Sequence, residues 1–227
     1  MKVLFWDIDG TLLQVGKAGL YAFDHAVQEI YERTIDYRLI KTSGMTDNYI
    51  AKQIIELIEE RDATADEIHR LTSRYEELLA EYLSNHPGQI LSGVTAMLTQ
   101  LSKRDDIIQL ILTGNSRHGA AVKLSYHGLD GFFDFDHSAF GDGCFDRNEI
   151  SAKAQRIVHD TYPSVQSSEI YVIGDTPNDV RCGKSIGART IAVASGRFSY
   201  DELIASTPWQ TLEELPAPQQ FINILEK

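Results

Sequence analysis

The stretch Val3-Leu4-Phe5-Trp6-Asp7-Ile8-Asp9-Gly10 decides the fold of this chain, because it has the pattern of a buried strand that ends at acidic residues and a glycine. The pattern returns at Ile107–Leu112, before Thr113-Gly114-Asn115, and at Ile170–Ile173, before Gly174-Asp175. Thr190–Val193 is a fourth apolar run of the same kind. These runs predict the strands of one sheet.

Helical patterns lie between the predicted strands, at Val94–Arg104, Ser116–His127, Glu149–Asp160 and Asn178–Ile186. Strands that alternate with helices predict an α/β fold with a doubly wound parallel sheet and right-handed crossovers. Such sheets bind ligands at the carboxyl ends of their strands. We therefore expect the polar loops after the first three strands to converge on one site.

The stretch from Lys17 to Leu83 breaks this alternation with three amphipathic helical patterns, at Gly19–Arg33, Thr46–Arg61 and Ala65–Leu83. Thr64 followed by Glu67 is typical of a capping box at a helix start. The sequence thus predicts an α/β core made of residues 1–15 and 87–227, with an all-helical domain, residues 16–86, inserted after the first strand.

The bulk properties narrow the class of protein. A net charge of −12 disfavours binding to nucleic acid. The apolar runs are too short to span a bilayer, and no apolar signal region follows Met1-Lys2. Cys144 and Cys182 cannot supply a disulfide framework. We expect a cytoplasmic protein with no membrane or nucleic-acid partner, and the sequence gives no indication of its oligomeric state.

Two acids at the end of the first strand are the first candidates for chemistry. Asp7 and Asp9 flank Ile8, and alternate residues of a strand share one face. Carboxylates that lie close together repel each other unless a cation or fixed donors compensate. The structural alternative is a turn capped by aspartate. Asp175 adds another acid at a strand end, and carboxylate oxygens suit Mg²⁺.

Two further loops complete the candidate site. Thr113-Gly114-Asn115-Ser116 offers a hydroxyl and backbone N–H groups before a helix, which favours an anion site, although Ser and Thr also commonly cap helices. Asp179 follows Asp175 four residues later and could cap the next helix.

Together these segments resemble the haloacid dehalogenase superfamily. Asp7-Ile8-Asp9-Gly10-Thr11-Leu12 is similar to its first motif, Leu112-Thr113-Gly114-Asn115 to its second, and Gly174-Asp175-Thr176-Pro177-Asn178-Asp179 to its fourth. The motifs occur in the family's order, and the helical insert corresponds to a family cap domain. Ser43-Gly44-Met45-Thr46-Asp47 is similar to a substrate loop of phosphoglycolate-phosphatase-like members.

The resemblance implies a Rossmann-like core and a Mg²⁺-dependent phosphatase acting on a small-molecule phosphate ester, phosphoglycolate-like or a sugar phosphate. Asp7 would be the nucleophile, which forms an aspartyl-phosphate, and Asp9 the general acid and base. The implied metal site comprises Asp7, Asp9 through its backbone carbonyl, Asp175 and Asp179. Thr113, Asn115 and Arg147 would bind the phosphoryl group, and the other expected substrate-binding residues are Gly10, Thr11, Gly114, Lys17, Thr46 and Asp47.

The third motif departs from the family, which usually offers a lysine there. The corresponding stretch is Asp146-Arg147-Asn148-Glu149, so Arg147 would take the cationic role, with Lys153 as the alternative. A solvated surface arginine is the structural reading of Arg147.

Other functions stay open on the same fold. One alternative is a phosphosugar mutase, and another is a haloacid dehalogenase, which Asp9 disfavours. A catalytically dead binding protein is the non-enzymatic alternative.

Overall fold

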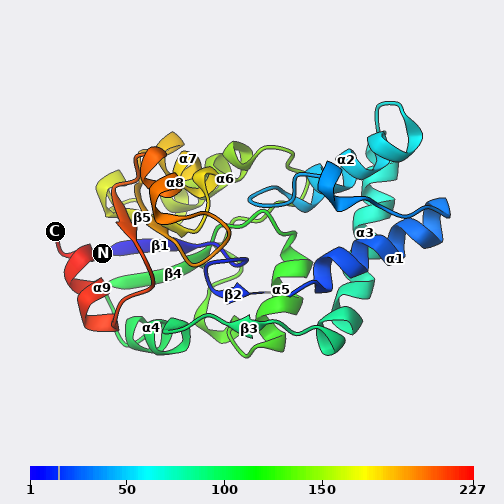
Figure 1. The fold of residues 1–227 in the computed structure, drawn as a ribbon. Helices are drawn as coiled ribbons and strands as arrows, with labels where there is room; N and C mark the ends of the chain where they lie inside the picture. The colour runs from blue at the N-terminus through cyan, green and yellow to red at the C-terminus, as the bar shows by residue number, and fades with distance from the viewer. Residues whose placement is uncertain (15) are drawn as a thin grey trace.

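A five-stranded parallel sheet forms the centre of the structure, a computed structural model that describes residues 1–14 and 16–227 (Figure 1). The strand order is β4-β1-β5-β6-β7. The strands span β1 Lys2–Trp6, β4 Ile107–Ile111, β5 Ile170–Gly174, β6 Arg189–Val193 and β7 Gln210–Leu212. The predicted α/β fold class is confirmed by this parallel arrangement.

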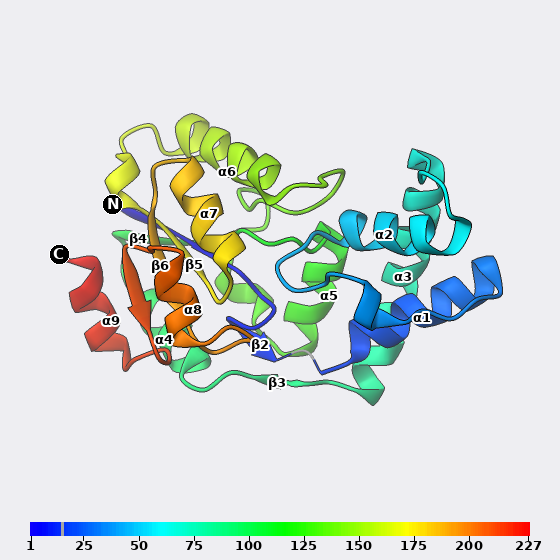
Figure 2. The same cartoon turned by 45° about the horizontal axis from the view of Figure 1, so that its top comes forward.

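Helices cover both faces of the sheet, which explains why its strands are apolar throughout. Val3 and Phe5 face α6 (Arg147–Thr161) and α7 (Pro177–Ser185). Leu4 and Trp6 point the other way, toward α4 (Val94–Leu101) and α9 (Pro218–Leu225). Figure 2 shows these two helical layers on opposite sides of the sheet.

The chain winds outward from β1 in both directions, since β4 pairs with one edge of β1 and β5 with the other. The end of β1 is therefore a topological switch point, where open α/β sheets bind their ligands. Asp7 lies there, and its backbone N–H donates to the carbonyl of Ile173 at 2.9 Å.

The inserted helices α1 (Ala18–Tyr31), α2 (Asp47–Glu59) and α3 (Ala65–Asn85) pack around an apolar cluster of their own. Phe23 and Tyr75 stack inside it, with ring centroids 3.9 Å apart. Thr64 and Glu67 form the expected capping box. On the core side, α3 packs against α5 (Arg117–Tyr126).

Two short strands tie together the segments that connect core and insert. β2 (Leu13–Gln14) pairs antiparallel with β3 (Gln89–Ile90), a pairing that the sequence did not predict. The expected boundary between residues 15 and 16 falls at Val15, which lies outside the described residues. The division into a core and an inserted cap domain remains a proposal, supported by the separate apolar clusters.

The remaining elements are short. They are α8 (Tyr200–Ala205) and the 3-10 helices Tyr37–Leu39, Asp130–Phe132 and Ser167–Glu169. Within residues 1–14 and 16–227, no helix combines the length and the apolar content needed to cross a bilayer.

Candidate active site

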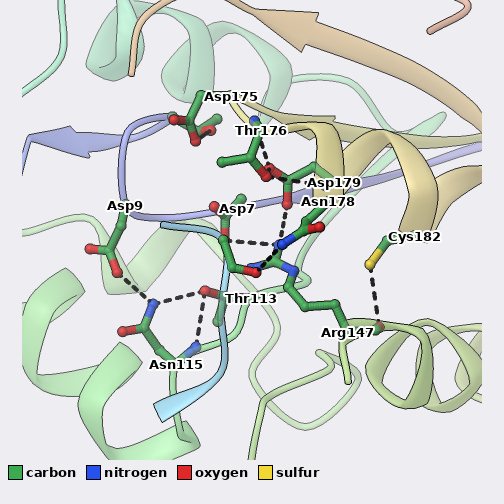
Figure 3. A network of polar contacts seen from close by, with 12 residues as sticks. Asp7, Asp9, Thr113, Asn115, Arg147, Asp175, Thr176, Asn178, Asp179 and Cys182 are labelled. Carbon is green, nitrogen blue, oxygen red and sulfur yellow. Dashed lines mark hydrogen bonds and ion pairs between the residues drawn. The ribbon is translucent and has the colours of Figure 1, made fainter. Parts of the chain in front are cut away.

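Three buried carboxylates meet at the switch point. Asp7 follows β1, Asp175 follows β5, and Asp179 lies in the first turn of α7. One oxygen from each lies within 4.8 Å of the others (Figure 3). The sheet therefore brings together the acids that were predicted from two separate motifs.

Arg147, the first residue of α6, supplies the buried positive charge. Its Nη2 lies 3.4 Å from Asp7 Oδ1 and also donates to Asp179 Oδ1. The Arg147 side chain is 3% exposed, so the surface reading of this arginine is wrong. Lys153 lies further along α6 and donates to the carbonyl of Asp142 at 2.7 Å, outside the cavity described below.

Asp179 serves both as a helix cap and as an ion partner. Its Oδ2 accepts from the backbone N–H of Thr176 at 3.0 Å and from the Thr176 hydroxyl at 2.6 Å. This capping box leaves Oδ1 to Arg147. The capping role that the sequence allowed for Asp179 is thus compatible with a place in the site.

The three clustered carboxylates carry more negative charge than the single positive charge of Arg147 can compensate. Burial raises the pKa of Asp7 to about 7, because the compensating charge of Arg147 is offset by Asp179 and Asp9. Burial, together with the charges of Asp179 and Asp7, raises the pKa of Asp175 to about 8. Within the described residues, Asp7 Oδ1 is also a buried acceptor without a hydrogen bond. Such a group calls for a further cation.

Mg²⁺ fits this set of donors. The three carboxylates are hard oxygen ligands that lie within 4.8 Å of one another, and Asp7 Oδ1 is a buried acceptor without a hydrogen bond. The side chain of Asp9 does not belong to this cluster.

The Asp9 carboxylate is instead held by Asn115 and Lys123. Lys123 Nζ lies 2.7 Å from Asp9 Oδ2 and 3.0 Å from Oδ1, and it donates to Asn115 Oδ1 at 2.6 Å. Asn115 Nδ2 donates to Asp9 Oδ2 at 2.9 Å. Lys123 lies on α5 and is buried under the insert. Sequence reasoning missed this residue, because a lysine on an amphipathic helix is expected on the solvated face.

The small residues of the predicted loops allow close approach. Gly10 has φ +88°, and a Cβ there would lie 2.3 Å from Asp175 Oδ2. The Thr11 hydroxyl donates to Asp175 Oδ1 at 3.3 Å, so Thr11 holds a carboxylate and does not line the cavity. Thr113 lines the cavity and accepts from Asn115 Nδ2 at 2.8 Å.

A loop of the insert, residues 43–47, is hydrogen-bonded to the core loop 113–116 and to the first turn of α7. Ser116 N–H donates to Asp47 Oδ2 at 2.9 Å, and Asp47 N–H donates to the carbonyl of Gly114 at 3.1 Å. Asn178 Nδ2 donates to the carbonyl of Gly44 at 2.8 Å. The loop therefore closes over the strand ends.

Thr46 has a structural place in this contact. Its hydroxyl caps α2 by accepting from the Tyr49 N–H, and it donates to the carbonyl of Cys144 at 2.8 Å. Thr46 is fully buried and does not line the cavity, so it anchors the insert instead of contacting a substrate. This corrects the prediction for Thr46.

A cavity of about 610 Å³ lies between the core and the inserted helices. Asp7, Asp9, Asp175 and Arg147 line its core side, and Asp47 lines the opposite side. Lys17 lines it from an exposed position at the start of α1. The remaining predicted residues on its wall are Gly10, Thr113, Gly114 and Asn115.

Comparison with known proteins agrees with this geometry. The family model of haloacid dehalogenase-like hydrolases matches residues 1–187. Among curated proteins, none matches the sequence.

Solved structures share the fold at low sequence identity. A HAD hydrolase of family IA, variant 3, from Entamoeba histolytica has a TM-score of 0.77 at 18% identity, with 100% of each chain covered. A predicted phosphoglycolate phosphatase from Haemophilus somnus has a TM-score of 0.72 at 16% identity, covering 99% of this chain and 97% of that one. A protein provisionally named a β-phosphoglucomutase, from Bacteroides vulgatus, has a TM-score of 0.73 at 17% identity, covering 100% and 89%.

Proposed function

Since the chain belongs to the haloacid dehalogenase-like hydrolase family, we propose that it is a Mg²⁺-dependent phosphatase that hydrolyses a small-molecule phosphate monoester through an aspartyl-phosphate on Asp7. The observation that carries the proposal is the state of Asp7. Its carboxylate lines the cavity, lies beside Arg147, and keeps Oδ1 without a hydrogen bond among the described residues. A carboxylate that faces the cavity beside a buried cation can approach a phosphoryl group and attack phosphorus.

The two catalytic carboxylates have different surroundings, which suits different tasks. Asp7 lies among the buried acids with Arg147, whereas Asp9 is half-exposed and held by Lys123 and Asn115. In the first step an Asp7 oxygen bonds to phosphorus, the bond to the leaving oxygen breaks, and Asp9 donates a proton to that oxygen.

In the second step water attacks phosphorus on the opposite side from Asp7. Asp9 accepts a proton from this water, the bond between phosphorus and Asp7 breaks, and inorganic phosphate leaves. Arg147 and the Thr113 hydroxyl, which both line the cavity, would hold the phosphoryl oxygens through each step.

Mg²⁺ held by Asp7, Asp175, Asp179 and the Asp9 backbone would neutralise negative charge on the carboxylates and the phosphoryl group. Without such a cation, a phosphate dianion at 4 Å from a single carboxylate charge meets a repulsion of roughly 4 kcal/mol per unit pair at an effective dielectric of 20.

The test is release of inorganic phosphate from a panel of monoesters, including p-nitrophenyl phosphate, phosphoglycolate and glucose 6-phosphate, with MgCl₂ or with EDTA. We expect Mg²⁺-dependent release that Asp7→Asn lowers by about 10³-fold or more. Asp105→Asn, at an exposed aspartate outside the cavity, is the matched control. Near-normal release by Asp7→Asn would refute the nucleophile.

The same assay separates the alternative enzyme. A mutase would convert β-glucose 1-phosphate to glucose 6-phosphate with little release of phosphate. Transfer without release would replace the phosphatase by this second activity, and absence of both would refute the proposal.

A further inference from the structure

The inserted helices form an apolar wall opposite the catalytic carboxylates. The apolar and aromatic side chains on this wall come from α1, α2, α3 and the loop before α2, and they are Leu20, Phe23, Met45, Ile50 and Tyr75. Thr42, Ser43 and Asp47 add polar groups to the same side of the cavity. Phe23 and Tyr75 stack at 3.9 Å with an interplanar angle of 9°, and both are almost fully buried. A leaving group that extends from Asp7 across the cavity meets this wall.

Among residues 1–14 and 16–227, each buried cation that lines the cavity already has a carboxylate partner. Of the cationic residues that line it, Lys123 is paired with Asp9, and Arg147 with Asp7 and Asp179. Lys17 and Arg197 are exposed residues. In the part of the chain that the structure describes, the insert contributes two charged residues to the cavity lining. They are the exposed Lys17 and the buried Asp47. A carboxylate on the substrate would be buried there without a partner, which is unfavourable.

Tyr75 adds an uncharged donor to the wall. Tyr75 is 1% exposed, and it lines the cavity. Burial and the nearby charges of Asp47 and Asp9 hold the pKa of Tyr75 well above its usual value, so the hydroxyl keeps its proton. A donor of this kind suits an uncharged acceptor on a ligand.

The volume of the cavity also favours a leaving group larger than a two-carbon acid. About 610 Å³ lies within the range of cavities that enclose ligands of drug size, and a phosphoryl group with a two-carbon acid fills little of it.

We infer that the substrate is a monoester of an uncharged alcohol with a ring-sized, largely apolar body that packs against Leu20, Phe23 and Ile50. This inference rests on the proposed phosphatase function. It departs from the likeness of residues 43–47 to a phosphoglycolate-type loop, because the wall around that loop offers apolar surface where a carboxylate would need a cation.

The first experiment compares primary alkyl esters, whose leaving alkoxides are similar in basicity. We expect kcat/KM for 2-phenylethyl phosphate to exceed that for 2-hydroxyethyl phosphate by about tenfold or more, as filling an apolar pocket does. Phosphoglycolate should be the poorest of the three. If phosphoglycolate is the best, or if the three are equal, the substrate class is wrong although the phosphatase stands. If no ester is hydrolysed, including p-nitrophenyl phosphate, both proposals fall.

The second experiment changes the substrate preference by adding a cation to the wall. Leu20 is half-buried on α1, so the stem of a lysine can replace it. We expect Leu20→Lys to lower kcat/KM for 2-phenylethyl phosphate and to raise it for phosphoglycolate, each by several-fold. Leu57→Lys adds the same charge to the insert at an exposed residue outside the cavity, and it should leave the ratio unchanged. Equal ratios in the two variants would contradict the assigned wall.

Discussion

Arg147 shows at the residue scale how one buried arginine can compensate two carboxylates. Its guanidinium reaches two carboxylates at once, at Asp7 and at Asp179, which a single ammonium point charge does less well. The pair is almost completely buried, so each partner depends on the other for compensation of its charge.

We predict that Arg147→Met abolishes measurable phosphatase activity and lowers the free energy of unfolding in the metal-free protein at pH 8 by about 3–5 kcal/mol, since it leaves buried carboxylates without their cation. Steady-state kinetics and urea unfolding measure the two effects. Arg156→Met, at an exposed residue of the same helix, should change neither. Wild-type kinetics in Arg147→Met would contradict a role for Arg147 in binding the phosphoryl group.

Lys123 is the second residue-scale case. Because it bonds both Asp9 and Asn115, we predict that Lys123→Met lowers kcat about 10- to 100-fold with a smaller change in KM, as the acid-base carboxylate loses its fixed position. Lys123→Arg should restore part of the loss, and Lys103→Met, at an exposed lysine outside the cavity, should have no effect. A change confined to KM would instead make Lys123 a substrate ligand.

At the scale of elements, the contact between the insert and the core depends on Gly114. A Cβ on Gly114 would lie 2.3 Å from the carbonyl oxygen of Met45, so the loop 43–47 can close only over a glycine. The same loop then receives hydrogen bonds from Ser116 and Asn178.

We predict that Gly114→Ala lowers kcat/KM at least about tenfold, because the added methyl pushes the loop away and opens the cavity to water. The loss caused by Gly114→Ala should appear mainly as a higher KM. The circular dichroism spectrum should show that the variant is still folded. Gly131→Ala is the matched control, since a Cβ there meets nothing within 4 Å. Equal kinetics for both variants would mean that the closed loop is not needed for turnover.

At the scale of the whole molecule, the buried carboxylates couple stability to pH and to metal. The pKa of Asp7 is raised from 3.8 to about 7 and that of Asp175 from 3.8 to about 8. Between about pH 5.5 and 8 these two carboxyls bind more protons in the folded protein than in the unfolded chain, so the stability that they contribute falls as pH rises through this window.

We predict that the metal-free protein has a lower unfolding temperature at pH 8 than at pH 5.5. Mg²⁺ should raise this temperature more at pH 8, because it binds the ionised carboxylates of the folded state. Differential scanning calorimetry with MgCl₂ or EDTA measures both effects. Asp175→Asn should reduce the dependence on pH and on Mg²⁺, and an increase in stability with pH in EDTA would contradict the assignment.

The long elements of the fold were predictable because their patterns are local. The buried strands at Lys2–Trp6 and Ile170–Gly174 are apolar on both faces, and the Thr64 capping box marks its helix directly in the sequence. The short strands Leu13–Gln14 and Gln210–Leu212 were missed because so few residues carry no periodic signal. Their pairing depends on neighbours that the fold supplies.

The sequence by itself determined that Asp7, Asp9, Thr113 and Asp175 stand at strand ends, since apolar runs and loop residues are encoded locally. Only the tertiary structure decided how these groups are paired. It buried Arg147 between Asp7 and Asp179, placed Lys123 under the insert against Asp9, and turned Thr46 from a substrate contact into an anchor. The physical reason is that burial and charge pairing depend on which elements pack together, and residues far apart in the chain decide that.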